Sequence, residues 1–261
     1  MGFDVTYHPF APSEVCTRYF DHFEDKDAYA RLAQEWGLDE NRKVMLQAFL
    51  AMGREFVEGK SLQQGHAYHI AMVSGLLRKY WYLRSCRFSR LLEFPEFSRY
   101  VIEWRELVPD GRHRENLIPD RGIRYRCGVF LSPQGLKQLR ADYDRDEVVH
   151  SGMNRVFPRA WLGIFWKAVD YAIEREMGLI EAIDLDAPNP SGSGGSYGLL
   201  PLEHRDVEGV ELYKEESLAR VKVLCRWREK RRRVRKRVGA RMRTQELPEG
   251  VRGTSRIDPA R

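Results

Sequence analysis

The sequence is poor in the features that mark secreted, membrane-spanning or metal-binding proteins. Only four cysteines occur among its 261 residues, at Cys16, Cys86, Cys127 and Cys225, and no two of them form a Cys-x-x-Cys pair. Scattered thiols are typical of a reducing compartment, and they favour neither a disulfide framework nor a zinc site. No basic region followed by an apolar stretch opens the chain, and no run approaches the roughly 18 apolar residues of a membrane-spanning helix. We therefore expect a soluble, cytoplasmic protein.

The common catalytic signatures are also missing. The sequence contains no Gly-x-Ser-x-Gly elbow and no His-Glu-x-x-His helix. The glycine-rich stretch SGSGGSYG, residues 191–198, has no lysine followed by Ser or Thr, so it does not fit a phosphate-binding loop. We therefore predict a non-catalytic protein without a cofactor, and keep an enzyme of unrecognised type as the second alternative.

Positive charge is concentrated at the C-terminal end. Residues 226–261 hold 14 Lys or Arg and 4 Asp or Glu, a net charge of +10. Of the chain's 44 basic and 38 acidic residues, this leaves 30 and 34 in residues 1–225, a net charge of −4. A domain that binds nucleic acid through its own surface normally carries the basic patch on the fold itself. Nucleic-acid binding by residues 1–225, which we call the body, is therefore not expected.

Apolar periodicity predicts an α+β fold, in which a mainly helical layer packs on a small β-sheet. The expected strands cover residues 2–8, 123–131 and 179–185. The expected helices cover residues 12–23, 27–36, 40–58, 61–85, 95–107, 133–143 and 158–177, and a last one runs from 209 into the basic segment.

These elements predict three regions along the chain. Residues 1–225 form a single α+β domain, and residues 226–243 form a basic helical extension. Residues 244–261 are expected to be a disordered tail, because proline and glycine recur there among polar residues.

The basic segment RWREKRRRVRKRVGARMR, residues 226–243, has apolar residues at helical spacing. Trp227, Val234, Val238 and Met242 follow one another at intervals of 7, 4 and 4. A basic amphipathic helix can bind phosphate backbones, an anionic membrane surface or a protein partner; the alternative is a terminal helix that docks through Trp227 and then frays. No sequence-specific DNA or RNA signature accompanies the charge. Under the nucleic-acid alternative, the candidate binding residues are Arg231, Arg232, Arg233, Arg235, Lys236 and Arg237.

Two groups of potential metal ligands receive a structural interpretation. His66 and His69 lie three residues apart on an expected helix, but no third ligand is near them in sequence. The stretch DYDRDEVVH, residues 142–150, lacks the glycine and the final glutamate of a calcium-binding EF-hand loop. We interpret the histidines as capping or core-edge residues and the acidic stretch as a solvated helix end, and predict no metal site.

An acidic surface is suited to a basic partner, because complementary charge speeds encounter and sets specificity. The expected partner is a toxic effector domain with a basic, nucleic-acid-directed cleft. An exposed aromatic side chain is a further contact candidate, and KYWYLRS, residues 79–85, places Tyr80 and Trp81 on a buried stripe with Tyr82 facing elsewhere. The alternative for Tyr82 is a hydrogen-bonding residue of the core. The candidate partner-binding residues are Tyr82, Asp142, Asp144, Asp146, Glu147, Ser193 and Tyr197.

Three stretches together resemble a group of uncharacterised bacterial cytoplasmic proteins that look like immunity proteins of secreted antibacterial toxins. They are MGFDVTYHP at the start, YWYLR at residues 80–84 and GLIEAIDLDAPNP at residues 178–190. The resemblance implies a non-catalytic protein that occludes its cognate toxin, as in toxin-antitoxin pairs. It does not include the basic segment, and SGSGGSYGLLP stands where the group has a polar, cysteine-containing loop.

Overall fold

The computed structural model describes residues 3–22, 25–57, 65–108, 127–190, 197–198 and 200–243. The chain forms two compact units, Met1–Glu215 and Glu216–Arg261. Helix α8 (Val207–Arg243) begins in the first unit and continues into the second, so the predicted limit at residue 225 falls inside a continuous helix. The predicted tail, residues 244–261, lies outside the described residues.

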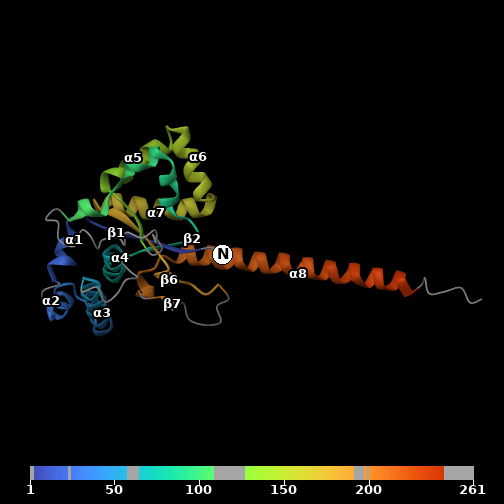
Figure 1. Cartoon of the computed structure of the whole chain (residues 1–261), viewed down its shortest axis with the longest axis horizontal. Coiled ribbons are helices and arrows are strands. Elements are labelled where there is room, and N and C mark those ends of the chain that lie inside the picture. The colour runs from blue at the N-terminus through green and yellow to red at the C-terminus, as the bar shows by residue number, and fades with distance from the viewer. Residues whose placement is uncertain are drawn as a thin grey trace, which may run out of the picture. The chain divides into compact units, whose positions relative to one another are not determined.

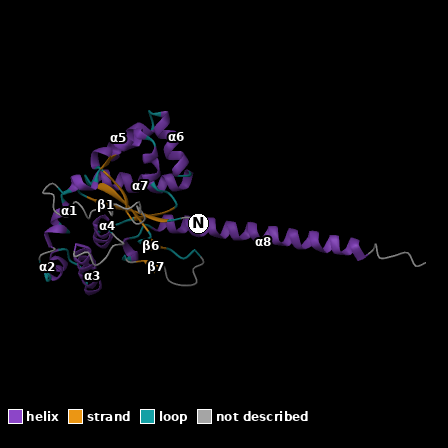
Figure 2. Cartoon of the chain, viewed as in Figure 1, coloured by secondary structure: helices purple, strands orange, loops and turns teal. Residues whose placement is uncertain are grey.

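A five-stranded sheet forms the centre of the first unit. The strands are β1 (Asp4–Phe10), β2 (Trp81–Arg84), β3 (Val101–Ile102), β4 (Cys127–Leu131) and β5 (Gly178–Ile183). Their order is β2-β1-β5-β4-β3, and each neighbouring pair is antiparallel. A separate pair is formed by β6 (Asp186–Ala187) and β7 (Tyr197–Gly198). Together with the helices around it, this sheet confirms the predicted α+β class (Figure 2).

Helices cover both faces of this sheet (Figure 1). On one face α4 (His66–Leu77) packs against the strands, and α1 (Glu14–Thr17), α2 (Ala28–Glu35) and α3 (Glu40–Val57) complete that layer. On the other face lie α5 (Pro133–Tyr143), α6 (Glu147–Val156) and α7 (Arg159–Glu174). In the part of the chain that the structure describes, no helix is long and apolar enough to cross a membrane.

The two layers explain why the central strand is apolar on both sides. Leu179 of β5 belongs to the core beneath α5–α7, whereas Ile180 and Ala182 belong to the core beneath α1–α4. Successive side chains of a strand point to opposite faces, so a strand between two helical layers buries nearly every residue. Every residue of β5 is buried accordingly.

Three predicted helices are wrong in part. The helix expected over residues 12–23 is divided into α1 and the 3₁₀ helix η1 (Phe20–His22), and the other two contain strands. Residues 61–85 were expected to form one helix, but α4 ends at Leu77, Arg78 is extended and the chain enters β2. Residues 95–107 form two 3₁₀ helices, η3 (Pro95–Tyr100) and η4 (Trp104–Leu107), with the short strand β3 between them. In both stretches the aromatic and β-branched residues pair with a neighbouring strand, and this tertiary pairing overrides helical spacing.

Candidate functional site

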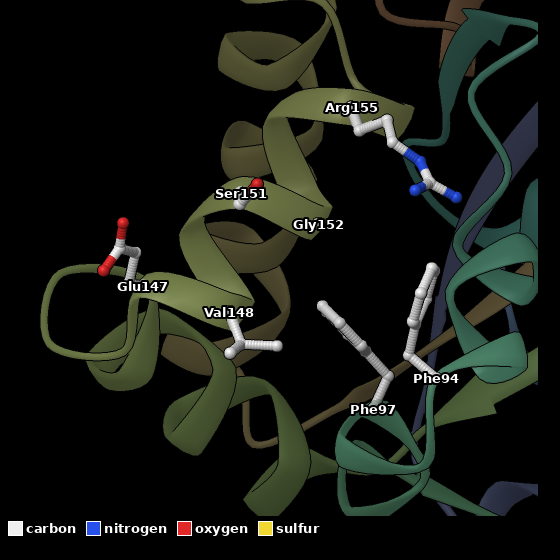
Figure 3. Close-up of a pocket in the computed structure, with 7 residues that line it drawn as sticks. All are labelled: Phe94, Phe97, Glu147, Val148, Ser151, Gly152 and Arg155. Carbon is white, nitrogen blue, oxygen red and sulfur yellow. The ribbon is translucent and has the colours of Figure 1, made fainter.

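A surface groove lies between α6 and the 3₁₀ helices η2 (Phe88–Glu93) and η3. Its volume is about 350 Å³, and Figure 3 shows its wall of α6 facing two phenyl rings. We call it the α6 groove. Its lining residues are Phe94, Phe97, Glu147, Val148, Ser151, Gly152 and Arg155.

The groove has an aromatic base with opposite charges near its two ends. Phe97 is fully buried and Phe94 half-buried, while Val148 on the opposite wall is 52% exposed. The guanidinium carbon of Arg155 lies 4.9 Å from the centroid of the Phe94 ring, a cation–π arrangement. In Figure 3 the side chain of Arg155 lies near the phenyl rings. Glu147 lies at the other end of α6, and its side chain points away from the rings.

Gly152 allows α6 to approach the base of the groove closely. A Cβ atom at this position would lie 2.6 Å from Cζ of Phe97. Real Cβ atoms essentially never approach another heavy atom so closely. A larger residue at position 152 would therefore push α6 away from the phenyl rings and change the shape of the groove.

The acidic residues predicted to face a partner lie beside this groove, where α5 passes into α6. We call Asp142, Asp144, Asp146 and Glu147 the acidic corner. The interpretation as a solvated helix end holds only in part, because α5 ends at Tyr143 and a new helix begins at Glu147. Glu147 is exposed and also lines the α6 groove, so the corner and the groove form one continuous candidate surface.

Two of the four acids have structural roles. Asp142 accepts hydrogen bonds from Arg99 Nη2 at 2.9 Å and from the Tyr100 hydroxyl at 2.8 Å. Asp146 is the N-cap of α6, accepting from the backbone N–H groups of Val148 and Val149, and it also pairs with Arg99 at 3.2 Å. Those backbone N–H groups, that of Val149 first, hold the pKa of Asp146 below its usual value.

The charge available to a partner is therefore smaller than the sequence count indicates. Arg99 compensates both Asp142 and Asp146. Asp144 and Glu147 are exposed, and they are the members of the acidic corner that we assign to partner contact.

Tyr82 is not at the surface, and the interpretation that placed it on an exposed face is wrong. It is fully buried in β2, where its hydroxyl donates to Asp4 Oδ1 at 2.6 Å. Its ring packs against Trp161 and Tyr213. The cause is the strand: β2 is covered by helices, so Tyr82 is buried as fully as its neighbours. The alternative interpretation, a hydrogen-bonding tyrosine of the core, describes its position.

The structure describes the other predicted site residues only in part. Ser193 lies outside the described residues, and for Tyr197 the structure describes the backbone, which forms β7 with Gly198. The six basic candidates Arg231, Arg232, Arg233, Arg235, Lys236 and Arg237 lie on the backbone of α8, and their side chains are outside the description.

The two histidines of α4 belong to the core. His66 is fully buried with its Nδ1 3.0 Å from the Tyr19 hydroxyl, and His69 is 2% exposed. Burial lowers the pKa of His69 to about 4, so it is neutral at physiological pH. Within the described ranges, no group of three or more His, Cys, Asp or Glu residues is placed to hold a metal ion.

A polar cluster around Glu181 is buried in the first unit, and no prediction from the sequence included it. Glu181 is fully buried in β5; its Oε1 accepts from the Ser89 hydroxyl at 2.6 Å, and its Oε2 accepts from the Tyr7 hydroxyl at 3.1 Å. Ser89 also donates its backbone N–H at 3.1 Å, and Arg87 Nε lies 3.8 Å from Oε1. Burial raises the pKa of the Glu181 carboxyl.

This cluster joins distant parts of the first unit. Tyr7 and Glu181 are on neighbouring strands of the sheet, and Ser89 is on η2, whose neighbour Phe94 lies in the α6 groove. The sequence contains one indication of this cluster, the single acidic residue within the apolar strand GLIEAI. A carboxyl group buried in such a strand requires hydrogen-bond donors around it. The cluster stabilises the base on which the groove is built.

Comparison with known proteins identifies no relative. No protein-family model, no curated protein and no solved structure matches the chain.

Proposed function

We propose that this protein is a non-catalytic binding protein of the immunity type, which occludes a toxic protein partner through the α6 groove and the acidic corner. The observation that carries the proposal is the groove itself, where two phenylalanines and an arginine surround a cavity at the surface. Aromatic residues and arginine dominate the energetics of protein interfaces.

The groove also indicates the chemistry of the partner segment. Its phenylalanine base and Val148 are suited to an apolar side chain of the partner. Burial of that side chain away from water would stabilise the complex. Next to it, Asp144 and Glu147 offer exposed carboxylates for a basic residue of the partner. We therefore propose a basic segment with an apolar anchor, as expected on a toxin that acts on nucleic acid.

The mildly acidic body supports the same partner class. Residues 1–225 carry a net charge of −4. Close to residues 1–225 this charge favours the approach of a basic toxin domain, and the groove then provides the direct contact.

The test uses the product of the neighbouring gene and two matched variants. Val148 in the groove and Val44 on α3 are both exposed valines on helices, 52% and 61% respectively. We expect the full chain to protect cells from that gene product and to bind it. Val148→Lys should weaken binding by at least about tenfold, because it places a charge in the apolar groove facing a basic segment.

Val44→Lys should leave affinity and protection unchanged. An equal loss in both variants, or no loss in either, would contradict the assignment to the groove. A neighbouring gene product that is harmless to cells lacking this protein would contradict the immunity function.

A further inference from the structure

The second unit contains a helical segment with exposed apolar residues. Residues 216–243 of α8 are helical throughout, a length of about 42 Å at the usual rise per residue. Leu218, Val221 and Val223 are more than half exposed, and Trp227 is 50% exposed. A succession of large apolar residues exposed along one helix marks a surface for interaction.

Two of these residues, Val223 and Trp227, share a side of the helix with apolar positions of the basic part, whereas Leu218 and Val221 lie on other sides. Val223, Trp227, Val234, Val238 and Met242 follow at intervals of 4, 7, 4 and 4. With 3.6 residues per turn, these intervals keep the five positions on one side of the helix. Arg231 falls on this side between Trp227 and Val234 and interrupts the stripe there.

The remaining positions are almost all basic. Residues 226–243 contain 11 Lys or Arg and a single acid, Glu229. The segment is thus a narrow apolar stripe on a strongly cationic helix, and a suitable partner must satisfy both properties.

Charge and apolar character together select one class of partner. A second copy of the helix would bring two segments of net charge +10 together, which is unfavourable. A nucleic-acid duplex would satisfy the charge, but its phosphate backbone offers no apolar contact for the valine positions. An anionic lipid surface offers both, because headgroup phosphates pair with arginine while the acyl boundary takes up apolar side chains.

We propose that residues 216–243 bind an anionic membrane surface as an amphipathic helix that lies in the plane of the interface. Trp227 is suited to this position, because its indole ring combines apolar area with a polar N–H group. The net positive charge attracts the segment to anionic lipid, and the stripe around Val238 anchors it. The proposal concerns a peripheral contact and is independent of the partner that occupies the α6 groove.

The experiment measures co-sedimentation of the full chain with vesicles of phosphatidylcholine alone and with vesicles that also contain phosphatidylserine. We expect binding to the anionic vesicles, and we expect added salt to weaken it. Val238→Asn should weaken binding by about fivefold, because an apolar side chain is lost from the stripe.

The matched control is Ala240→Asn. Position 240 lies two residues farther along and on the opposite side of the helix, so it is outside the stripe. This control loses more helix propensity than the Val238 variant, because alanine is the best helix former. Unchanged vesicle binding by the control therefore attributes the effect of Val238→Asn to the stripe rather than to helix loss.

Three results would overturn the proposal. The first is equal binding to neutral and anionic vesicles, and the second is a Val238→Asn variant that binds like the wild type. The third is full-chain binding to a DNA or RNA duplex, insensitive to Val238→Asn, without sedimentation with anionic vesicles. That result would assign the basic segment to nucleic acid instead.

Discussion

Tyr7 and Glu181 are direct cross-strand neighbours at the centre of the sheet, and the tyrosine hydroxyl donates to the glutamate carboxyl at 3.1 Å. The same hydroxyl accepts the backbone N–H of Phe88 at 2.9 Å. One hydrogen-bonded pair therefore connects β1, β5 and the start of η2. Because η2 precedes the phenylalanines of the α6 groove, the shape of the candidate site depends on this buried pair.

Replacement of Glu181 by leucine should destabilise the first unit strongly. The substitution leaves both donors of Ser89 without their acceptor, while the Tyr7 hydroxyl keeps the backbone carbonyl of Cys86, 3.0 Å away, as an acceptor. We expect a cost of about 3 kcal/mol of unfolding free energy. Glu181→Gln retains an acceptor oxygen and the side-chain volume, so it should cost about 1 kcal/mol or less. Urea denaturation of both variants measures the difference; equal costs would show that the hydrogen bonds contribute little.

The pH dependence of the glutamine variant provides an independent test. The folded-state pKa of Glu181 is raised above its ordinary value of 4.5, so the folded protein holds this proton more tightly than the unfolded chain. The wild type therefore loses stability as pH rises above 4.5 through the folded-state pKa, and glutamine does not titrate. The cost of Glu181→Gln should be greatest at acid pH and decrease toward neutral pH. A cost independent of pH would contradict the raised pKa.

Gly128→Ala should be destabilising because of Glu181. A Cβ at position 128 would lie 1.9 Å from Glu181 Oε1, and the three nearest atoms all belong to Glu181. We expect a loss of about 2 kcal/mol in the wild type, and a loss smaller by at least about 1 kcal/mol in a Glu181→Ala background. The control is Gly163→Ala on α7, where a Cβ meets nothing within 4 Å and should stabilise the helix.

Part of this architecture could be predicted from the sequence. The α+β class and the strands around β1 and β4 follow from alternating apolar residues, and α5 and α7 follow from helical spacing and capping. The segment Tyr80–Arg84 was assigned to a helix because a continuous apolar run has no period that distinguishes a buried helix from a strand covered on both faces.

The candidate site was less accessible from the sequence. The acidic corner was found, but the role of Asp146 as a helix cap depends on where α6 begins. Phe94 and Arg155 lie far apart in sequence and meet only when α6 packs on η2. In the Glu181 cluster, Ser89 is 92 positions and Tyr7 is 174 positions from Glu181 in the sequence. No local sequence pattern therefore predicts that they meet.

His69 should make stability depend on pH in the opposite direction from Glu181. Burial lowers its folded-state pKa from 6.5 to about 4, so the unfolded chain binds this proton more readily. The stabilisation is complete above pH 6.5 and is lost as pH falls toward 4, by roughly 1.4 kcal/mol per pH unit. His69→Phe should reduce the slope of unfolding free energy against pH in this window. An unchanged slope would show that folding does not lower the pKa of His69.

The acidic corner allows structural and binding roles to be separated within four residues. Asp146 caps α6 and pairs with Arg99, whereas Asp144 is an exposed residue just after α5. Asp146→Ala should lower the urea midpoint of unfolding, because two backbone N–H groups of α6 lose their acceptor. Asp144→Lys should leave that midpoint unchanged and weaken binding of the basic partner, because it reverses a charge beside the groove.

Measuring both properties in both variants makes this comparison decisive. A fall in affinity for Asp144→Lys at unchanged stability would place the partner at the corner, since Asp144 has no capping role in α6. A fall in affinity for Asp146→Ala alone would instead mean that the partner requires an ordered α6 and not the exposed charge. In that case the anchor of the interaction is the apolar groove between Val148 and Phe97, and Asp144 lies outside the interface.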